Sequence, residues 1–285
     1  SSAGLFTSTT IDATKLTGNL PAISGASLTN LPSTSTADIL TATTIQKTAT
    51  SNIGLGANAV DSITTGDYNI GIGDTALTAN TEGANNTATG FEALKANTTG
   101  SYNTAFGRRA LDANTTGSYN VSLGRDSLGS NTTADANVAI GNAALFANTT
   151  GANNVGIGYD ALNANTTGSP NIAVGKDALK ANTTGHNNVA LGYQSMYSNT
   201  TGNGRNTAVG TGSMYTNTTG YQNTAVGHNS LYAITTGYMN TAIGEQTGDA
   251  NTTGIENAFL GYAAGGANTT ASNNCFVGAY SGNVN

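Results

Sequence analysis

Residues 171–185 have the sequence Asn-Ile-Ala-Val-Gly-Lys-Asp-Ala-Leu-Lys-Ala-Asn-Thr-Thr-Gly, and this stretch decides the fold of the chain. Two variable residues follow it, His186 and Asn187, and Asn188 then begins the same pattern again. The unit is seventeen residues long and recurs from Asn52 onward. Because a fixed period of this length indicates stacked structural units, it takes precedence over every other feature of the sequence.

The repeats begin at evenly spaced asparagines, with one exception. The spacing is seventeen residues except between Asn188 and Asn206, where it is eighteen, which we interpret as a loop bulge. The repeats start at Asn52, Asn69, Asn86, Asn103, Asn120, Asn137, Asn154, Asn171, Asn188, Asn206, Asn223, Asn240, Asn257 and Asn274. We number the positions of each repeat 1 to 17 from this asparagine, and we expect residues that share a position to lie above one another.

The composition of the 285-residue chain excludes several classes of protein. Charged residues make up 8 %, against about 25 % in typical soluble proteins, so a thin core suits the chain better than a thick globular one. The net charge of −6 provides no basic surface for nucleic acid. No apolar run approaches the roughly 20 residues of a membrane span, so we expect no membrane insertion.

Positions 2 to 5 predict a short strand followed by a corner. Positions 2 and 4 are apolar or β-branched, as in Ile172 and Val174, and they lie on one face of a strand. Position 3 between them is small in most repeats, as in Ala173. Position 5 is glycine in every repeat, which indicates positive φ or close backbone contact at a first corner.

Positions 8 to 15 predict a second strand and a second corner. Position 9 is usually leucine, and we expect Leu145, Leu162 and Leu179 to form a ladder of inward-facing plugs on that strand. Positions 12 to 15 are mostly Asn-Thr-Thr-Gly, which is turn chemistry. The fold class predicted for residues 52–285 is therefore all-β: a parallel β-solenoid of seventeen-residue coils, stacked at ~4.8 Å into a rod of roughly 65 Å.

Both ends of the chain depart from the pattern. Residues 1–51 are rich in serine, threonine and alanine and lack the period, so we interpret them as an extended connector or stalk. From about residue 245 the coils are altered: position 9 becomes Gly248 and Gly265, and position 3 becomes Phe259 and Phe276. A lost leucine and a gained phenylalanine at nearby levels could conserve the core volume.

The small residues at positions 3, 8 and 11 favour a homotrimer, because they would let the backbones of sister chains approach closely.

The string at residues 137–147, Asn-Val-Ala-Ile-Gly-Asn-Ala-Ala-Leu-Phe-Ala, resembles the head repeats of YadA-like trimeric autotransporter adhesins, whose second corner is shorter. Residues 16–21 and 28–32, Leu-Thr-Gly-Asn-Leu-Pro and Leu-Thr-Asn-Leu-Pro, together with the repeats resemble bacteriophage tail fibres.

This resemblance implies a left-handed roll of three chains that acts in attachment to a host or surface. It also implies an extracellular location, in a virion fibre or a cell-surface appendage, and leaves open whether the owner is a virus or a bacterium. Two other functions stay open: a subunit of a self-assembling extracellular filament, and an ice-binding solenoid with columns of threonine.

Catalytic chemistry is not expected. His186 and His228 occupy unrelated positions, and no carboxylate or basic cluster recurs along one side, so we predict no enzyme activity, no cofactor and no metal site. Cys275 stands where other repeats have valine, isoleucine or threonine, and we expect a small buried residue. The Asn-Thr-Thr strings match the N-glycosylation pattern, but turn chemistry alone explains them.

Tyrosines form the candidate binding surface. Tyr197, Tyr215 and Tyr232 share position 10 of successive coils, so we expect them to stack and to face outward. The same surface would include Tyr193, Tyr221 and Tyr238. One interpretation is a structural ladder of aromatic pairs. The other is a platform for a host glycan or protein, because tyrosine offers a flat apolar area with a polar tip.

Overall fold

A computed structural model describes residues 51–201 and 204–283, and in them every repeat contributes one strand. The predicted connector at residues 1–51 lies, but for Ser51, outside the described residues. The strands are β1 (Ile53–Leu55), β2 (Ile70–Ile72), β3 (Thr87–Thr89), β4 (Thr104–Phe106), β5 (Val121–Leu123), β6 (Val138–Ile140), β7 (Val155–Ile157), β8 (Asn171–Val174), β9 (Asn188–Leu191), β10 (Thr207–Val209), β11 (Thr224–Val226), β12 (Thr241–Ile243), β13 (Ala258–Leu260) and β14 (Cys275–Val277).

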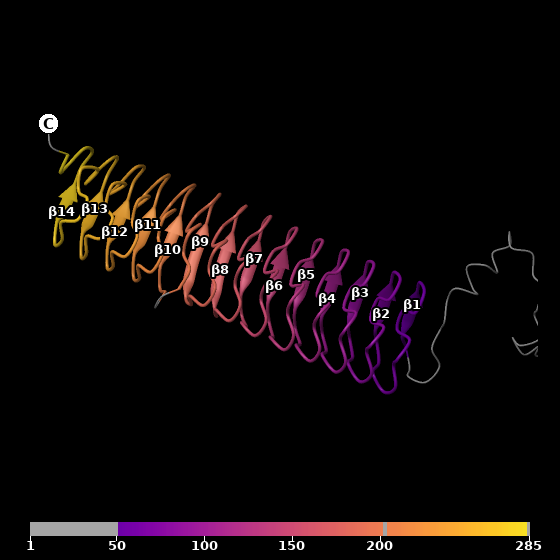
Figure 1. Ribbon diagram of the computed structural model, residues 1–285. Coiled ribbons are helices and arrows are strands. Elements are labelled where there is room, and N and C mark those ends of the chain that lie inside the picture. The colour runs from indigo at the N-terminus through magenta and orange to yellow at the C-terminus, as the bar shows by residue number, and fades with distance from the viewer. Residues whose placement is uncertain (1–50, 202–203, 284–285) are drawn as a thin grey trace, which may run out of the picture. The chain divides into compact units, whose positions relative to one another are not determined.

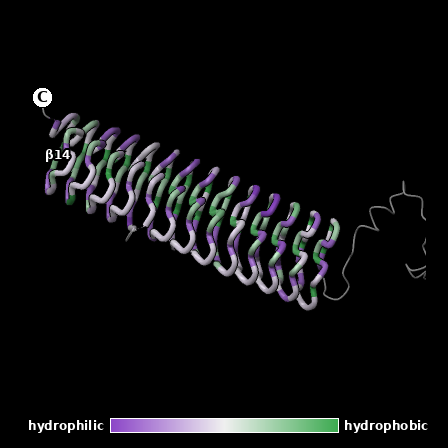
Figure 2. Tube along the Cα trace, in the orientation of Figure 1, coloured by the Kyte–Doolittle hydropathy of each residue, from purple (hydrophilic) through white to green (hydrophobic). Residues whose placement is uncertain are grey.

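These strands form one parallel sheet in chain order, from β1 to β14, along the side of a rod of stacked coils (Figure 1). The register matches like with like: Ile172 pairs with Val189 and Ala173 with Ala190. In Figure 2, apolar segments recur at the same place in successive coils, as this register requires. The predicted all-β parallel solenoid with one coil for each seventeen-residue repeat is confirmed.

The prediction of a second strand in each coil is wrong. Positions 6 to 11 form turns, and the residues at positions 7 and 9 have left-handed backbone, as in Asp160 and Leu162, both with φ of 53°. Left-handed backbone normally costs an L-residue roughly 1–2 kcal/mol, so it must be offset. It turns successive amides toward opposite neighbours: Leu162 N donates to Ala178 O in the next coil, and Asp160 N donates to Asn142 O in the previous one.

The core is built from positions 3, 8 and 9, and positions 2 and 4 face outward. Leu145, Leu162 and Leu179 are fully buried, as are the alanines at positions 3 and 8, whereas Ile140 is 37 % exposed and Ile172 41 %. The interpretation that positions 3 and 8 are small in order to contact sister chains is therefore wrong. A coil this thin holds one large side chain at each level, so the residues opposite it must be small.

Two columns of buried asparagine tie the coils together. At position 1, Asn154 N donates to Asn137 Oδ1 at 2.9 Å, and Asn154 Nδ2 donates to Gly168 O at 2.8 Å. At position 12, Asn165 Nδ2 donates to Asn148 Oδ1 at 2.8 Å and to Gly168 O at 3.1 Å. In both columns the side-chain oxygen accepts a hydrogen bond from the next coil, and the side-chain nitrogen donates to a backbone carbonyl of its own coil. The position 12 nitrogen also donates to the previous coil. These bonds satisfy the buried polar atoms of the side chains.

Isoleucine replaces asparagine in the second column at Ile63, in the first coil, and at Ile234, and the second case shows what the column requires. Ile234 occupies position 12 in place of asparagine, and Asn217 Oδ1 in the coil before it is buried without a hydrogen-bond partner. In this column each side-chain oxygen accepts from the side-chain nitrogen of the next asparagine, so a coil without asparagine leaves the oxygen before it without a donor.

The glycine at position 5 is required by backbone and by space. Gly158 has φ of 132°, which side-chain-bearing residues rarely adopt. A Cβ on Gly158 would also lie 2.5 Å from Gly175 O in the next coil. Each coil therefore turns its first corner directly against the corner of its neighbour.

In the altered last coils, a phenylalanine fills the space that leucine occupies elsewhere. Phe259 is 1 % exposed and stacks on Phe276 with ring centroids 5.6 Å apart. A Cβ added to Gly248 or Gly265 would lie 2.6 or 2.7 Å from the Phe259 ring, so each glycine makes room for it. In these coils the large core side chain is at position 3 instead of position 9, so each still contributes one large group to the core.

We predict that Asn137→Ala lowers the free energy of unfolding by about 1–3 kcal/mol, because it leaves the buried N–H of Asn154 without an acceptor. Urea denaturation measures the total effect, and hydrogen exchange at the Asn154 amide reports its location. The control is Thr150→Ala, at an exposed corner, which should stay within about 0.5 kcal/mol of the parent chain. Equal exchange rates for the Asn154 amide in both variants would contradict a ladder that stabilises the stack.

Candidate functional site

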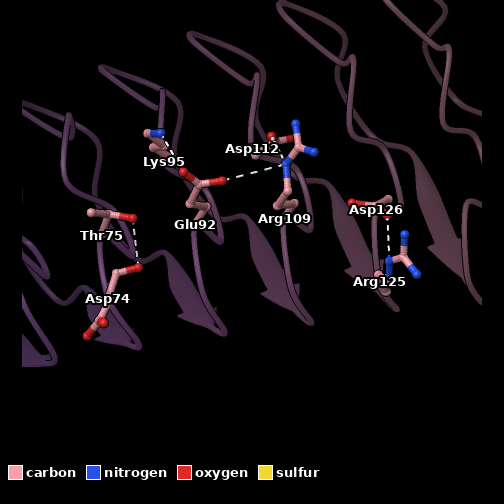
Figure 3. Close-up of polar contacts among 8 residues, drawn as sticks. All are labelled: Asp74, Thr75, Glu92, Lys95, Arg109, Asp112, Arg125 and Asp126. Atoms are coloured by element: carbon pink, nitrogen blue, oxygen red, sulfur yellow. Dashed lines mark hydrogen bonds and ion pairs between the residues drawn. The ribbon is translucent and has the colours of Figure 1, made fainter.

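Most charged residues of the repeats lie at positions 6, 7 and 10. Lys95 Nζ lies 2.7 Å from Glu92 Oε1, and Arg109 Nε lies 3.6 Å from Glu92 Oε2 and 3.1 Å from Asp112 Oδ2 (Figure 3). The hydrogen bond from Lys95 lowers the pKa of Glu92, whereas burial raises the pKa of Asp112 in spite of Arg109. The Arg109–Glu92 pair joins successive coils, and the other two pairs lie within one coil. The charges neutralise one another rather than converge on a reacting centre.

Two lysines of the middle coils are also engaged. Lys180 Nζ lies 2.8 Å from Asp160 Oδ2 and 2.9 Å from Asp177 Oδ1, and these two carboxylates raise the pKa of Lys180 well above its ordinary value. Lys176 Nζ lies between two aromatic rings, 5.8 Å from the centroid of Tyr159 and 5.7 Å from that of Tyr193. Both ammonium groups therefore serve contacts between coils.

The position 10 tyrosines form a closed stack. The ring centroids of Tyr197 and Tyr215 are 5.1 Å apart, with an angle of 9° between the ring planes. Those of Tyr215 and Tyr232 are 5.2 Å apart, with an angle of 5°. Lys180, on the coil before Tyr197, places its Nζ 5.9 Å from the centroid of the Tyr197 ring. Both faces of the Tyr215 ring are thus covered by other rings, so a ligand could reach its edge and hydroxyl but could not stack on it.

The other predicted tyrosines belong to two separate groups. Tyr193 shares position 6 with Lys176 and lies outside the stack of position 10. Tyr221 and Tyr238 form their own pair at position 16, with centroids 4.7 Å apart at 5°. The rings of the six tyrosines therefore do not form one stack.

One cavity was missed by the sequence analysis. It has a volume of about 310 Å³ and is lined by His186, Arg205, Tyr221 and Gln222. It lies beside the one repeat that is eighteen residues long, from Asn188 to Arg205, so the irregular spacing was the signal that could have revealed it. Tyr221 is the one member of the predicted tyrosine surface that lines it.

Cys275 corrects an expectation. It is exposed rather than buried, because position 2 points away from the core. His228 Nδ1 lies 3.6 Å from Glu245 Oε1, and it is far along the chain from His186. Among residues 51–201 and 204–283, no three His, Cys, Asp or Glu side chains are grouped so that they could hold a metal ion.

The Asn-Thr-Thr corners are structural in the folded chain. Asn148 is fully buried, and its Nδ2 donates to Asn131 Oδ1 at 3.0 Å and to Gly151 O at 2.9 Å. Both amide hydrogens are used, so the nitrogen that a glycan would occupy is inaccessible in the fold. Thr149 Oγ1 in turn donates to Thr166 O at 3.1 Å in the next coil.

Comparison of the chain with models of protein families, with curated proteins and with solved structures found no match. In the described part of the chain, no helix has the length and apolar character needed to cross a membrane. The geometry defines the class of protein as a tandem-repeat parallel β-solenoid.

We predict that Tyr215 ionises above the ordinary tyrosine pKa of about 10. Burial, and then the neighbouring Tyr197 and Tyr232, raise the pKa of Tyr215. Because the folded pKa lies above the unfolded one, the stabilisation by the stack is complete below about pH 10 and is lost as the pH rises through the folded pKa. Absorbance at 295 nm, for the parent chain minus Tyr215→Phe, measures this step, and a difference midpoint at or below 10 would contradict the stack.

Proposed function

We propose that the solenoid is the shaft or head of an attachment fibre, built from parallel copies of this chain. The observation that supports this most is an apolar stripe at positions 2 and 4 that runs along the sheet from β1 to β14. Its exposed members include Ile53, Leu55, Ile72, Phe106, Leu123, Ile140, Ile172, Leu191, Ile243, Leu260 and Val277. No charged residue occupies positions 1 to 5 in any repeat. Threonine occupies both positions in β3, and every other strand supplies at least one apolar side chain. A long, mainly apolar exposed stripe of this kind marks an interaction surface.

The period of the stripe favours a second copy of this chain as the partner. A surface that matches apolar side chains along the whole rod must repeat at the same spacing of about 4.8 Å. Parallel copies in register meet this condition at every coil, and cyclic symmetry about an axis along the rod covers each stripe. A hollow of about 230 Å³ that opens beside Ile172 and Val189 offers room for side chains of the partner.

Three copies are favoured by the resemblance to trimeric adhesins and tail fibres, which also implies the left-handed coil. In this proposal the fibre lies outside the cell, in a virion or on a cell surface, and contacts a host or surface. It has no catalytic role, because the charged side chains at positions 6, 7 and 10 neutralise one another. The threonines of position 13 do not favour ice binding, because their hydroxyls, such as Thr149 Oγ1, donate to backbone carbonyls.

We predict that the chain forms rods of one fixed length, roughly 65 Å in the solenoid part, with the mass of three chains. Light scattering after size-exclusion chromatography measures the mass, and negative-stain imaging measures the length. Ile140→Glu combined with Ile172→Glu should give single chains, because charges would be buried at the interface. Thr150→Glu, at an exposed corner, is the control and should leave the mass unchanged. Polymers of indefinite length would support the filament function instead, and a monomeric parent chain would refute the assembly.

We predict that mild oxidation links copies through Cys275, the single cysteine of the chain. Cys275 lies at position 2, on the stripe, so parallel copies in register hold their thiols at one level, as a disulfide requires. Antiparallel copies would separate the thiols by roughly 60 Å. The control moves the cysteine to an exposed corner of the same end of the rod, in Cys275→Ser with Thr269→Cys. Non-reducing gels should show linked chains for the parent alone, and equal linking of both would argue against this interface.

A further inference from the structure

The position 16 column lacks one side chain beside the long repeat. Arg205 N donates to His186 O at 3.2 Å, and Gln222 N donates to Gly204 O at 3.1 Å. In regular coils the same ladder joins position 17 to position 16 of the coil before, as where Tyr119 N donates to Ser101 O at 3.0 Å. The bonding therefore places Gly204 at position 16 and Arg205 at position 17 of the eighteen-residue repeat.

A side chain on Gly204 cannot fill this level. Gly204 has φ of 59°, and a Cβ built on it would collide with the carbonyl oxygen of His186. Glycine is thus enforced where the neighbouring coils carry His186 and Tyr221. Among the described residues, the side chains of His186 and Tyr221 line the cavity from the coils on either side of this level.

The width of the gap follows from the stacking distance. Tyr221 and Tyr238, on adjacent coils, have ring centroids 4.7 Å apart. His186 and Tyr221 are two coils apart, so their levels are separated by roughly 9.5 Å, twice the spacing between strands. Two contacts between carbon atoms at about 3.5–4.0 Å each take roughly 7–8 Å, so the space between the two side chains holds one ring and not two.

The charge of the gap selects the ligand. The cavity lining of His186, Arg205, Tyr221 and Gln222 contains no carboxylate, in a chain whose net charge is −6. Arg205 is exposed, and no ion pair within 4.0 Å engages its guanidinium among the described residues. A free guanidinium beside two hydrogen-bonding side chains fits a carboxylate on a ligand that also carries hydroxyl groups.

We propose that this gap binds one residue of an acidic sugar, a pyranose ring that bears a carboxylate. The ring lies between His186 and Tyr221 in place of the missing side chain, and Arg205 holds the carboxylate. Gln222 and the Tyr221 hydroxyl supply hydrogen-bond partners for the sugar hydroxyls. The inference rests on the single chain, so it does not depend on how copies assemble.

Saturation-transfer NMR with D-glucuronate on the full chain tests the site. Glucuronate should bind saturably, and glucose should bind at least roughly tenfold more weakly, because it lacks the charge-assisted contact to Arg205. Arg205→Gln should weaken glucuronate binding by a similar factor. The variant keeps the backbone, since glutamine already occupies position 17 at Gln222 with φ of 55°. Tyr221→Leu should also weaken binding, because it removes one ring face.

Arg108→Gln is the matched control, since it removes the same charge from a distant coil and should leave glucuronate binding unchanged. Acetate and benzoate serve as competitors that separate the ligand classes. If acetate competes as well as glucuronate, the site is a simple anion site and the proposal is overturned. Stronger competition by benzoate would replace the sugar by an aromatic acid. Equal glucuronate binding to Arg205→Gln and the parent chain would place binding elsewhere on the rod.

Discussion

The structure depends on one hydrogen bond that repeats at every level: the side-chain oxygen of the position 1 asparagine accepts the backbone N–H of the asparagine in the next coil. Asn154 N to Asn137 Oδ1 and Asn171 N to Asn154 Oδ1 are successive examples. An aspartate column would place like charges above one another, and an apolar column would leave buried amides unsatisfied. Asparagine supplies both a donor and an acceptor, so the bond fixes the register, and the register places every other position in a column.

That register limits the chemistry that the surface can carry. Identical charges in one column would repel, and at position 7 the chain alternates them in Glu92, Arg109 and Asp126. Where Asp160 and Asp177 follow one another in that column, Lys180 pairs with both. Aromatic side chains in a column cover one another, which leaves Tyr215 without a free face. A perfect repeat therefore presents filled columns, and a ring-sized gap opens in a column only where that column is interrupted.

The period predicted the solenoid, the glycine corner and the exchange of leucine for Phe259 in the last coils, because each depends only on which residues share a position. The direction of the side chains was harder to predict. The alternation of large and small residues in Ile172, Ala173 and Val174 is compatible with either set facing the core. The interior of a single coil is narrow, so the small residue faces the core and the two large ones face outward. The left-handed backbone at Leu162 was hidden because leucine rarely adopts it, and hydrogen bonds to both neighbouring coils stabilise it here. The spacing likewise predicted that the tyrosines stack, but not which ring faces stay open.

The eighteen-residue repeat shows that one inserted residue need not break the two asparagine columns. Both asparagine columns continue past it: Asn206 Nδ2 donates to Asn188 Oδ1 at 3.2 Å, and Asn217 Nδ2 donates to Asn199 Oδ1 at 3.1 Å. The coils on either side of the inserted residue therefore stay connected through both columns. The walls of the gap, His186 and Tyr221, are held by separate coils whose separation these columns fix. A ligand that enters would meet a site whose width is already set, so little of its binding energy would be spent on ordering the protein.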